Sequence, residues 1–379
     1  MGKGKIWPVE MKEVKDLKTG LMLKQLTDYR GHSHHLYFTN PGWYAGGEKL
    51  LFGSDRENRN NLFSIELSTG AITQLTELEP LDPPYEVGFL KVCVNPHRNE
   101  AYYIYGLEVR ALDLDSLEER VLGKFDPGFR ISMINCTADG TSICGGEFED
   151  LSSKITIDYL RGYIGFAETH DAYPQSRIIK FATDGSGQEV VWEEEYWIGH
   201  VNTSPTQPNI LTFCHEGPWD KVDNRMWGLD LKTGKGWKIR ERKENESVGH
   251  EYWYADGIHL GYHGRYPDKH AIFGKIKYDD SDNVETPCEK ETGHTHSNDD
   301  NLIVGDGGRE VRLWKKEGNV YSGPRMLAEH RSTMNIQKVH VHPRFTADGR
   351  QVLFTSDWTG YGNVYLADVP EFESLSEIP

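Results

Sequence analysis

The chain has 379 residues, a formal net charge of −17 at neutral pH, 11% aromatic residues and 39 glycines. The acidic balance argues against nucleic-acid binding, because a phosphate backbone would meet a repulsive field. It still allows a small anionic substrate in a locally basic site. Abundant glycine and aromatic residues predict many short strands and tight turns rather than long helices.

The cysteines and the N-terminus predict where the protein works. Five cysteines, an odd number without CxxC spacing, favour buried thiols in a reducing compartment over a disulfide framework. The first twenty residues contain no apolar run typical of a signal peptide. No stretch approaches the ~18 apolar residues of a membrane span. We therefore expect a soluble, cytoplasmic protein without a membrane partner.

Internal repeats predict the architecture. Residues 51–67 match residues 353–369, each with Ser-Asp at the start of a loop and Asn at its end, and Ala-Asp-Gly recurs at 138–140, 255–257 and 347–349. Repeats of roughly 40–50 residues are typical of four-stranded propeller blades. The predicted units begin near Leu36, Val92, Ile131, Val201, Glu251, His296 and Pro343.

We therefore predict an all-β, seven-bladed β-propeller in a single domain, residues 1–379, and favour it over an open stack of sheets. An insertion from Phe148 to Arg177 lengthens the third unit. Residues 18–27 resemble residues 68–76, the outer strand of the first unit. An N-terminal strand at about 18–28 is therefore predicted to complete the last blade and close the ring, which removes a sheet edge.

Histidines gather just before the first strand of several units, where propeller loops converge. They are His32, His34, His35, His200, His250, His294, His296, His340 and His342. A scattered set of histidines would not favour these positions, so the clustering indicates a functional site. The alternative for each histidine taken alone is a structural hydrogen bond between blades.

The stretch from Gln337 to Pro343 predicts a metal site. If it is extended, His340 and His342 project to the same side, with the amide of Gln337 upstream. Imidazole suits first-row divalent cations, and a further histidine from the preceding unit would complete the set as its fourth ligand. We interpret Asp306, between two glycines, as a turn residue rather than a ligand.

A second candidate cluster lies around Arg225. This arginine sits beside aromatic residues and could clamp a carboxylate, although an ion pair with Glu216 or Asp223 is the simpler alternative. His250 could accept a proton near neutral pH, or could serve only to support neighbouring groups.

These motifs together resemble the oligogalacturonate lyases, a family of pectin-degrading seven-bladed propeller lyases, over essentially the whole chain. The resemblance is strongest in residues 213–218, 223–227, 244–247, 250–253, 304–307, 337–343, 354–357 and 367–371. One departure is Ser33, which stands where the family has cysteine in a Cys-His-x-x-Tyr-Phe segment.

The resemblance implies roles for individual residues. It implies that Gln337, His340 and His342 bind a divalent metal, typically manganese, with His294 as fourth ligand and His296 as its nearby alternative. It also implies that His250 is the catalytic base and that Arg225 assists at the reacting centre. We expect substrate contacts from a further set: His34, Arg59, His200 and His215.

The resemblance thus implies a metal-dependent lyase that cleaves short, digalacturonate-like oligogalacturonides by β-elimination to an unsaturated uronate. Three alternatives stay open at this point. One is a non-enzymatic propeller that binds or scaffolds other molecules, and another is a lyase for a different uronic-acid oligosaccharide. The third is a hydrolase or epimerase on the same scaffold, whose products would lack the double bond.

Overall fold

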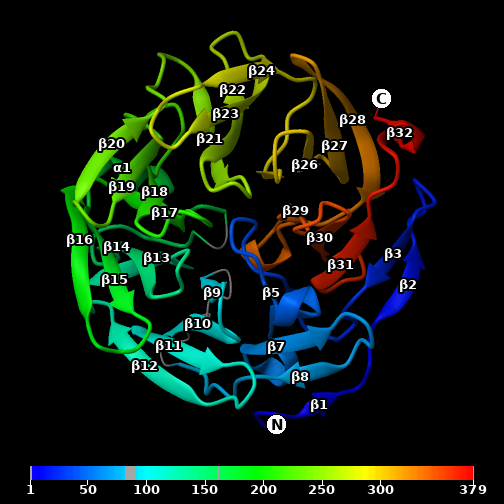
Figure 1. The fold of residues 1–379 in the computed structure, drawn as a ribbon, viewed down its shortest axis with the longest axis horizontal. Coiled ribbons are helices and arrows are strands. Elements are labelled where there is room, and N and C mark those ends of the chain that lie inside the picture. The colour runs from blue at the N-terminus through cyan, green and yellow to red at the C-terminus, as the bar shows by residue number, and fades with distance from the viewer. Residues whose placement is uncertain (1, 82–90, 160–161, 379) are drawn as a thin grey trace. The chain divides into compact units, whose positions relative to one another are not determined.

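The computed structural model describes residues 2–81, 91–159 and 162–378, and regular structure in these segments is almost entirely β-strand. Seven antiparallel sheets of four or more strands follow one another, as the blades of a seven-bladed β-propeller, which confirms the predicted fold class (Figure 1). In the described segments the only α-helix is α1 (Phe166–Asp171), and no helix there is long and apolar enough to cross a membrane.

The first, sixth and seventh sheets belong to one compact unit, unit 1, and the second to fifth sheets to the other, unit 2. The first sheet contains β1 (Ile6–Trp7), β4 (Ser33–His34), β5 (Trp43–Tyr44), β6 (Lys49–Ser54), β7 (Asn61–Glu66) and β8 (Ile72–Gln74). The sixth contains β25 (Thr295–His296), β26 (Leu302–Gly307), β27 (Glu310–Glu317), β28 (Val320–Glu329) and β32 (Ser376–Glu377). The seventh contains β2 (Lys12–Lys15), β3 (Met22–Gln25), β29 (Arg344–Phe345), β30 (Gln351–Ser356) and β31 (Asn363–Asp368).

Unit 2 contains four sheets of consecutive strands. The second sheet contains β9 (Val92–Val94), β10 (Glu100–Tyr105), β11 (Glu108–Asp113) and β12 (Glu119–Lys124). The third contains β13 (Phe129–Cys136), β14 (Ser142–Glu149), β15 (Gln175–Ala182) and β16 (Gln188–Glu195). The fourth contains β17 (Ile198–Thr203), β18 (Ile210–His215), β19 (Met226–Asp230) and β20 (Lys235–Ile239). The fifth contains β21 (Ser247–Trp253), β22 (His259–Arg265), β23 (Ala271–Lys277) and β24 (Val284–Pro287).

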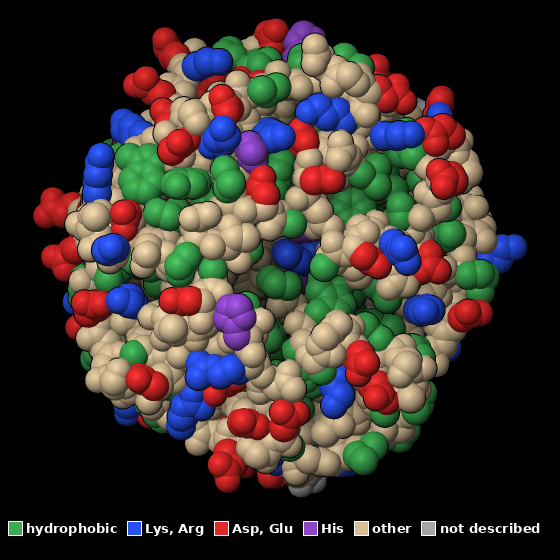
Figure 2. All heavy atoms as spheres, in the orientation of Figure 1, with side chains coloured by type: hydrophobic (Ala, Val, Ile, Leu, Met, Phe, Trp, Pro, Cys, Tyr) green, Lys and Arg blue, Asp and Glu red, His purple; other side chains and the backbone are tan. Residues whose placement is uncertain are grey.

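Short 3-10 turns complete the regular structure. They are η1 (Ala45–Gly47), η2 (Arg56–Asn58), η3 (Gln337–Val339) and η4 (Phe372–Ser374). Acidic and basic side chains are interspersed on the face that Figure 2 shows, without one large basic field.

The predicted blade boundaries agree with the strands. Five of the seven predicted starts fall inside the first strand of a sheet, and the other two, Leu36 and Pro343, lie within two residues of β4 and β29. The three Ala-Asp-Gly segments are turns between the first and second strands of their sheets. The expectation of a single domain stays a prediction.

The insertion in the third blade is shorter than predicted. Phe148 and Arg177 are ladder residues of β14 and β15, so the inserted segment is 150–174 and contains α1. Aromatic packing holds the inserted segment in place, since the ring of Phe166 in α1 lies 5.0 Å from the ring of Trp197.

The hydrophobic core is divided among neighbouring sheets of each unit. In unit 1, Leu23 packs in a cluster shared by the sixth and seventh sheets. Leu26 packs in a second cluster, shared by the first and seventh sheets. The N-terminal strand thus contributes to two of the clusters that hold unit 1 together.

The N-terminal strand joins the last blade, as predicted. β3 pairs antiparallel with β31, with Leu23 opposite Ala367, and Figure 1 shows β2 and β3 beside β31. The side chain of Gln25 donates to the carbonyl of Thr27 (2.8 Å). The hydroxyl of Thr27 donates to Oδ1 of Asn363 (3.0 Å) and accepts from the N–H of Val364 (3.0 Å).

Residues 68–76 of the first blade, which resemble residues 18–27 in sequence, form the same pattern of hydrogen bonds. Gln74 donates to the carbonyl of Thr76 (2.8 Å), whose hydroxyl donates to Asn61 (2.9 Å) and accepts from the N–H of Leu62 (2.9 Å). The similarity between residues 18–27 and 68–76 therefore reflects one buried network that is used twice. It specifies the strand that the N-terminus joins.

The Thr27→Val substitution tests this network. It leaves the buried Oδ1 of Asn363 and the N–H of Val364 without their partner, which should lower the free energy of unfolding by about 1–3 kcal/mol in urea denaturation. The control is Thr233→Val, at an exposed turn, with an expected change of about 0.5 kcal/mol or less. Equal stability of the two variants would contradict the role assigned to Thr27.

Candidate functional site

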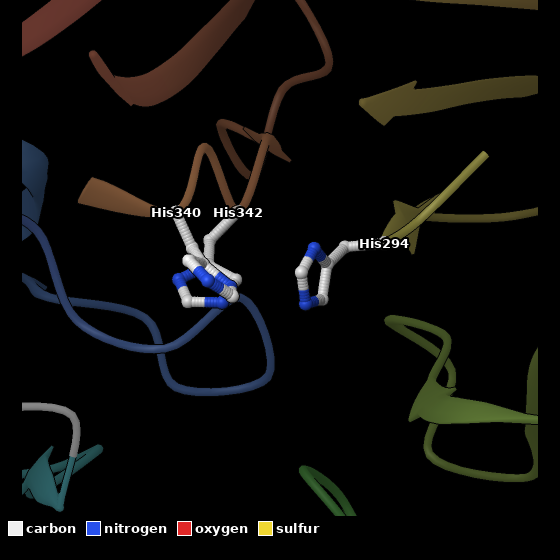
Figure 3. Close-up of side chains that lie close together, drawn as sticks. All are labelled: His294, His340 and His342. Carbon is white, nitrogen blue, oxygen red and sulfur yellow. The ribbon is translucent and has the colours of Figure 1, made fainter. Parts of the chain in front are cut away.

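Three histidines of unit 1 converge, as Figure 3 shows. His294 immediately precedes β25, whereas His340 and His342 lie between η3 and β29. One ring nitrogen from each lies within 4.8 Å of the others, and all three side chains are buried. This spacing suits a single metal ion held by several imidazoles.

The backbone around His340 differs from the predicted extended strand. Gln337–Val339 is a 3-10 turn, closed by the N–H of His340 donating to the carbonyl of Gln337 (3.2 Å). His342 has φ of +44°, in the left-handed region that residues other than glycine rarely adopt. These two features, rather than strand alternation, bring the two rings together.

Asp306 positions the ring of His294. Its carboxylate accepts from Nδ1 of His294 (2.7 Å) and from the backbone N–H of the same residue (2.5 Å). With Nδ1 occupied, Nε2 is the nitrogen of His294 left for a ligand. Although burial alone would raise the pKa of Asp306, His294 lowers it below its usual value, so the carboxylate is ionised.

Asp306 lies in strand β26, so its interpretation as a turn residue was wrong. Gly293 permits its approach to His294, since a Cβ on Gly293 would stand 2.7 Å from Oδ1 of Asp306.

Further contacts support the neighbouring loop. Nε2 of His35 donates to the carbonyl of Val341 (3.2 Å), between the two histidines, and the ring of Tyr37 packs edge-on against His342 at 4.8 Å.

Burial lowers the pKa of His340 to about 4, so its ring is the neutral form that metals bind. Its buried Nδ1 has no hydrogen-bond partner in the described segments, and a bound metal ion would satisfy this nitrogen.

His296, the alternative fourth ligand, occupies a different environment. Its Nδ1 accepts from the backbone N–H of Phe345 (3.3 Å), and it is not one of the three histidines that converge. Gln337 lies in η3, three residues before His340, and is partly buried. Its role as a ligand stays a prediction.

His250 lies in unit 2, in strand β21. The strand is bulged between Gly249 and Tyr252, and His250 has φ of +50°. His250 and His342 are the two histidines with positive φ, and all sixteen histidines lie in described segments. Bulges and left-handed residues re-aim side chains and often occur at functional sites.

The ring of His250 has two close neighbours. Its Nδ1 lies 3.1 Å from Nε2 of His263, so one ring donates to the other. The ring of Trp219 packs edge-on at 5.0 Å. His250 is half-buried and His263 is buried. The sequence pattern contained no signal for His263, which meets His250 through strand pairing.

Arg225 is buried and bridges two carboxylates of unit 2. Its Nη1 donates to Glu216 (2.7 Å) and its Nε to Glu251 (3.2 Å). The simpler alternative, an ion pair with Glu216, is therefore present. The predicted alternative partner Asp223 instead pairs with His215.

The four residues expected to contact substrate divide between the two units. In unit 1, His34 is buried, with Nδ1 donating to the carbonyl of His35 (3.0 Å), and Arg59 pairs with Glu79 (2.7 Å). Burial is the main reason that the pKa of His34 falls to about 3.

The other two expected contacts, His200 and His215, lie in unit 2. His200 is half-buried in β17, near Cys214 and Glu216. His215 is buried, and its two ring nitrogens lie 2.5 Å from Asp223 and 3.1 Å from Glu194. Burial alone would lower the pKa of His215, but the hydrogen bonds and charges of Asp223 and Glu194 raise it above its usual value.

Known proteins resemble this chain along its whole length. The family model described as oligogalacturonate lyase matches residues 1–323. An oligogalacturonide lyase of Pectobacterium atrosepticum is 30% identical, and the match covers 98% of this chain and 99% of the relative. An oligogalacturonate lyase of Dickeya dadantii is 29% identical, with the same coverage.

Solved structures agree. An oligogalacturonate lyase in complex with manganese superposes with a TM-score of 0.86 at 27% identity, over 98% of this chain and 99% of the other. A second oligogalacturonate lyase, from Vibrio parahaemolyticus, gives the same values. The repeat pattern, the seven blades and the full-length matches lead to one conclusion: the chain belongs to the oligogalacturonate lyase family.

Proposed function

We propose that the protein is a metal-dependent lyase that cleaves short oligogalacturonides by β-elimination and releases an unsaturated uronate. The observation that carries the proposal is the convergence of three buried imidazoles, one oriented by a carboxylate, in a member of this family. Neutral imidazoles with a hydrogen-bonded supporting carboxylate are typical of metal centres.

The proposed metal ligands are His294, His340, His342 and Gln337. Manganese is the proposed ion, because a family member of the same fold is known in complex with manganese. A bound divalent ion would act as a Lewis acid that neutralises the uronate carboxylate and so stabilises negative charge beside C5.

His250 is the proposed base. For its Nε2 to accept a proton, Nδ1 must carry hydrogen, and Nε2 of His263 lies where it can accept that hydrogen. The C5 proton passes to His250, the C4–O bond breaks, and the electron pair of the C5–H bond becomes the C4–C5 double bond. The leaving oxygen takes up a proton, and no water is consumed.

Arg225 is the proposed assistant at the reacting centre. Glu216 and Glu251 fix its guanidinium, so it would meet substrate oxygens in a preset orientation. The remaining proposed substrate contacts are His34, Arg59, His200 and His215.

The proposed substrate is a digalacturonate-like anionic oligosaccharide, and the proposed location is the cytoplasm. The five free cysteines support a reducing compartment. The net charge of −17 supports the proposal that nucleic acid is not a partner. We propose no membrane partner either.

Digalacturonate with added manganese should give a rise in the ultraviolet absorbance of the unsaturated product. Chelation should abolish the signal, and manganese should restore it.

His340→Ala should lower both manganese affinity and activity, because it removes one converging imidazole. A signal with a different uronide only would indicate the alternative substrate. Absence of signal with every uronide and manganese would favour a non-enzymatic binding propeller.

Asp306→Asn tests the orientation of His294. Loss of the carboxylate charge should weaken manganese binding about 10–100-fold in isothermal titration calorimetry, because supporting carboxylates raise ligand basicity. Asp16→Asn is the matched control, because Asp16 is a buried carboxylate of unit 1 that accepts from the backbone N–H groups of Lys18, Thr19 and Glu329 rather than from a histidine. Equal affinities for the two variants would rule out this role of Asp306.

His250→Ala and His250→Gly separate catalysis from backbone conformation. Both should lower activity about 100-fold or more, as expected on removal of a general base. His250→Gly should be more stable than His250→Ala by about 1 kcal/mol in urea denaturation, because φ of +50° costs alanine but not glycine. Near-normal activity of either variant would remove His250 from the proposed mechanism.

A further inference from the structure

Unit 2 contains a second group of metal-ligating side chains, formed by His200, Cys214 and Glu216. One ligand atom from each lies within 4.8 Å of the others. His200 is in β17, Cys214 is in the neighbouring strand β18, and Glu216 follows β18 directly. The group therefore rests on two paired strands of one blade rather than on a loose surface loop.

The local backbone is shaped to bring these atoms together. The pairing of β17 and β18 shifts between Ile198 and Val201, which places His200 in a bulge. The N–H of His200 donates to Sγ of Cys214 (3.1 Å), and Sγ lies 3.8 Å from Oε2 of Glu216. A Cβ on Gly199 would stand 2.5 Å from that Oε2 and 2.7 Å from that Sγ, so glycine is required there.

The surroundings carry an excess of buried negative charge. Glu216 and Glu251 share the single guanidinium of Arg225, and no other Lys or Arg pairs with either carboxylate in the described segments. Glu251 is 1% exposed, and its Oε1 has no hydrogen-bond partner there. A buried carboxylate that is not compensated costs free energy, and a bound cation would compensate it.

We propose that His200, Cys214 and Glu216 bind a borderline divalent cation such as Zn²⁺, at a site separate from the three histidines of unit 1. Imidazole, thiolate and carboxylate are the ligands that Zn²⁺ takes in proteins, with a fourth position open to water. The thiol releases its proton to solvent as the bond between Sγ and the metal forms.

Occupancy of the site would act on Arg225. Oε1 of Glu216 holds the guanidinium, while Oε2 of the same carboxylate faces Cys214. A cation on Oε2 would draw charge away from Arg225 and alter its orientation. Zn²⁺ at this site would therefore regulate the protein through the orientation of the Arg225 guanidinium. Metal binding itself does not depend on the proposed lyase activity.

Cobalt(II), which substitutes for Zn²⁺ and gives a near-ultraviolet charge-transfer band when bound to thiolate, provides the test. Titrating the intact, reduced protein with cobalt should give this band, and excess Zn²⁺ should remove it. The band should vanish in Cys214→Ser and persist in Cys288→Ser, a control at the half-buried cysteine. It should also persist in His294→Ala, which separates this site from the three-histidine centre.

A second variant keeps the test informative if Cys214→Ser does not fold. His200→Ala, at a half-buried ring, should weaken cobalt binding about ten-fold or more. Three results would overturn the proposal: a folded wild-type protein without the band, a band that survives in folded Cys214→Ser, or unchanged cobalt affinity in His200→Ala. Loss of lyase activity alone would bear on the proposed function and not on this site.

Discussion

The cost of burying three imidazoles beside one another is the constraint on which the centre in unit 1 depends. Each neutral ring carries one donor and one acceptor nitrogen, and a buried nitrogen without a partner is unfavourable. Asp306 satisfies Nδ1 of His294, whereas Nδ1 of His340 has no partner in the described segments. A divalent cation would satisfy the remaining nitrogens together.

The histidine side chains are directed by irregular backbone segments, and regular β-sheets hold those segments in place. His342 and His250 both have left-handed φ, at a loop that follows a 3-10 turn and at a strand bulge. Each such residue costs roughly 1–2 kcal/mol. The surrounding sheets compensate for it, and in unit 1 the pairing of β3 with β31 is part of that frame. Strain of this kind is expected where side-chain direction matters more than stability.

The architecture could be predicted from sequence because each blade repeats a local pattern. The Thr and Asn residues that recur in the first and last blades are the ones that form the buried network. The boundaries of the insertion were misplaced, because Phe148 and Arg177 continue the strands on either side of it without a change in pattern.

The histidines that gather before the first strands of the blades predicted a metal site with His340 and His342, and the family resemblance selected His294 over His296 to complete it. The groups that support the site histidines, Asp306 and His263, were not predicted. Flanking glycines made Asp306 look like a turn residue, but it lies in a strand, and the glycines make room for the side chains of Thr292 and Arg312. His263 meets His250 only through the register of β21 and β22, which no local pattern specifies.

The most direct measurement is a manganese anomalous difference map from crystals of the protein grown with manganese. The account predicts a peak in unit 1 coordinated by His294, His340 and His342, with the side chain of Gln337 beside it. A protein that binds manganese tightly but shows its peak away from these histidines would contradict the account.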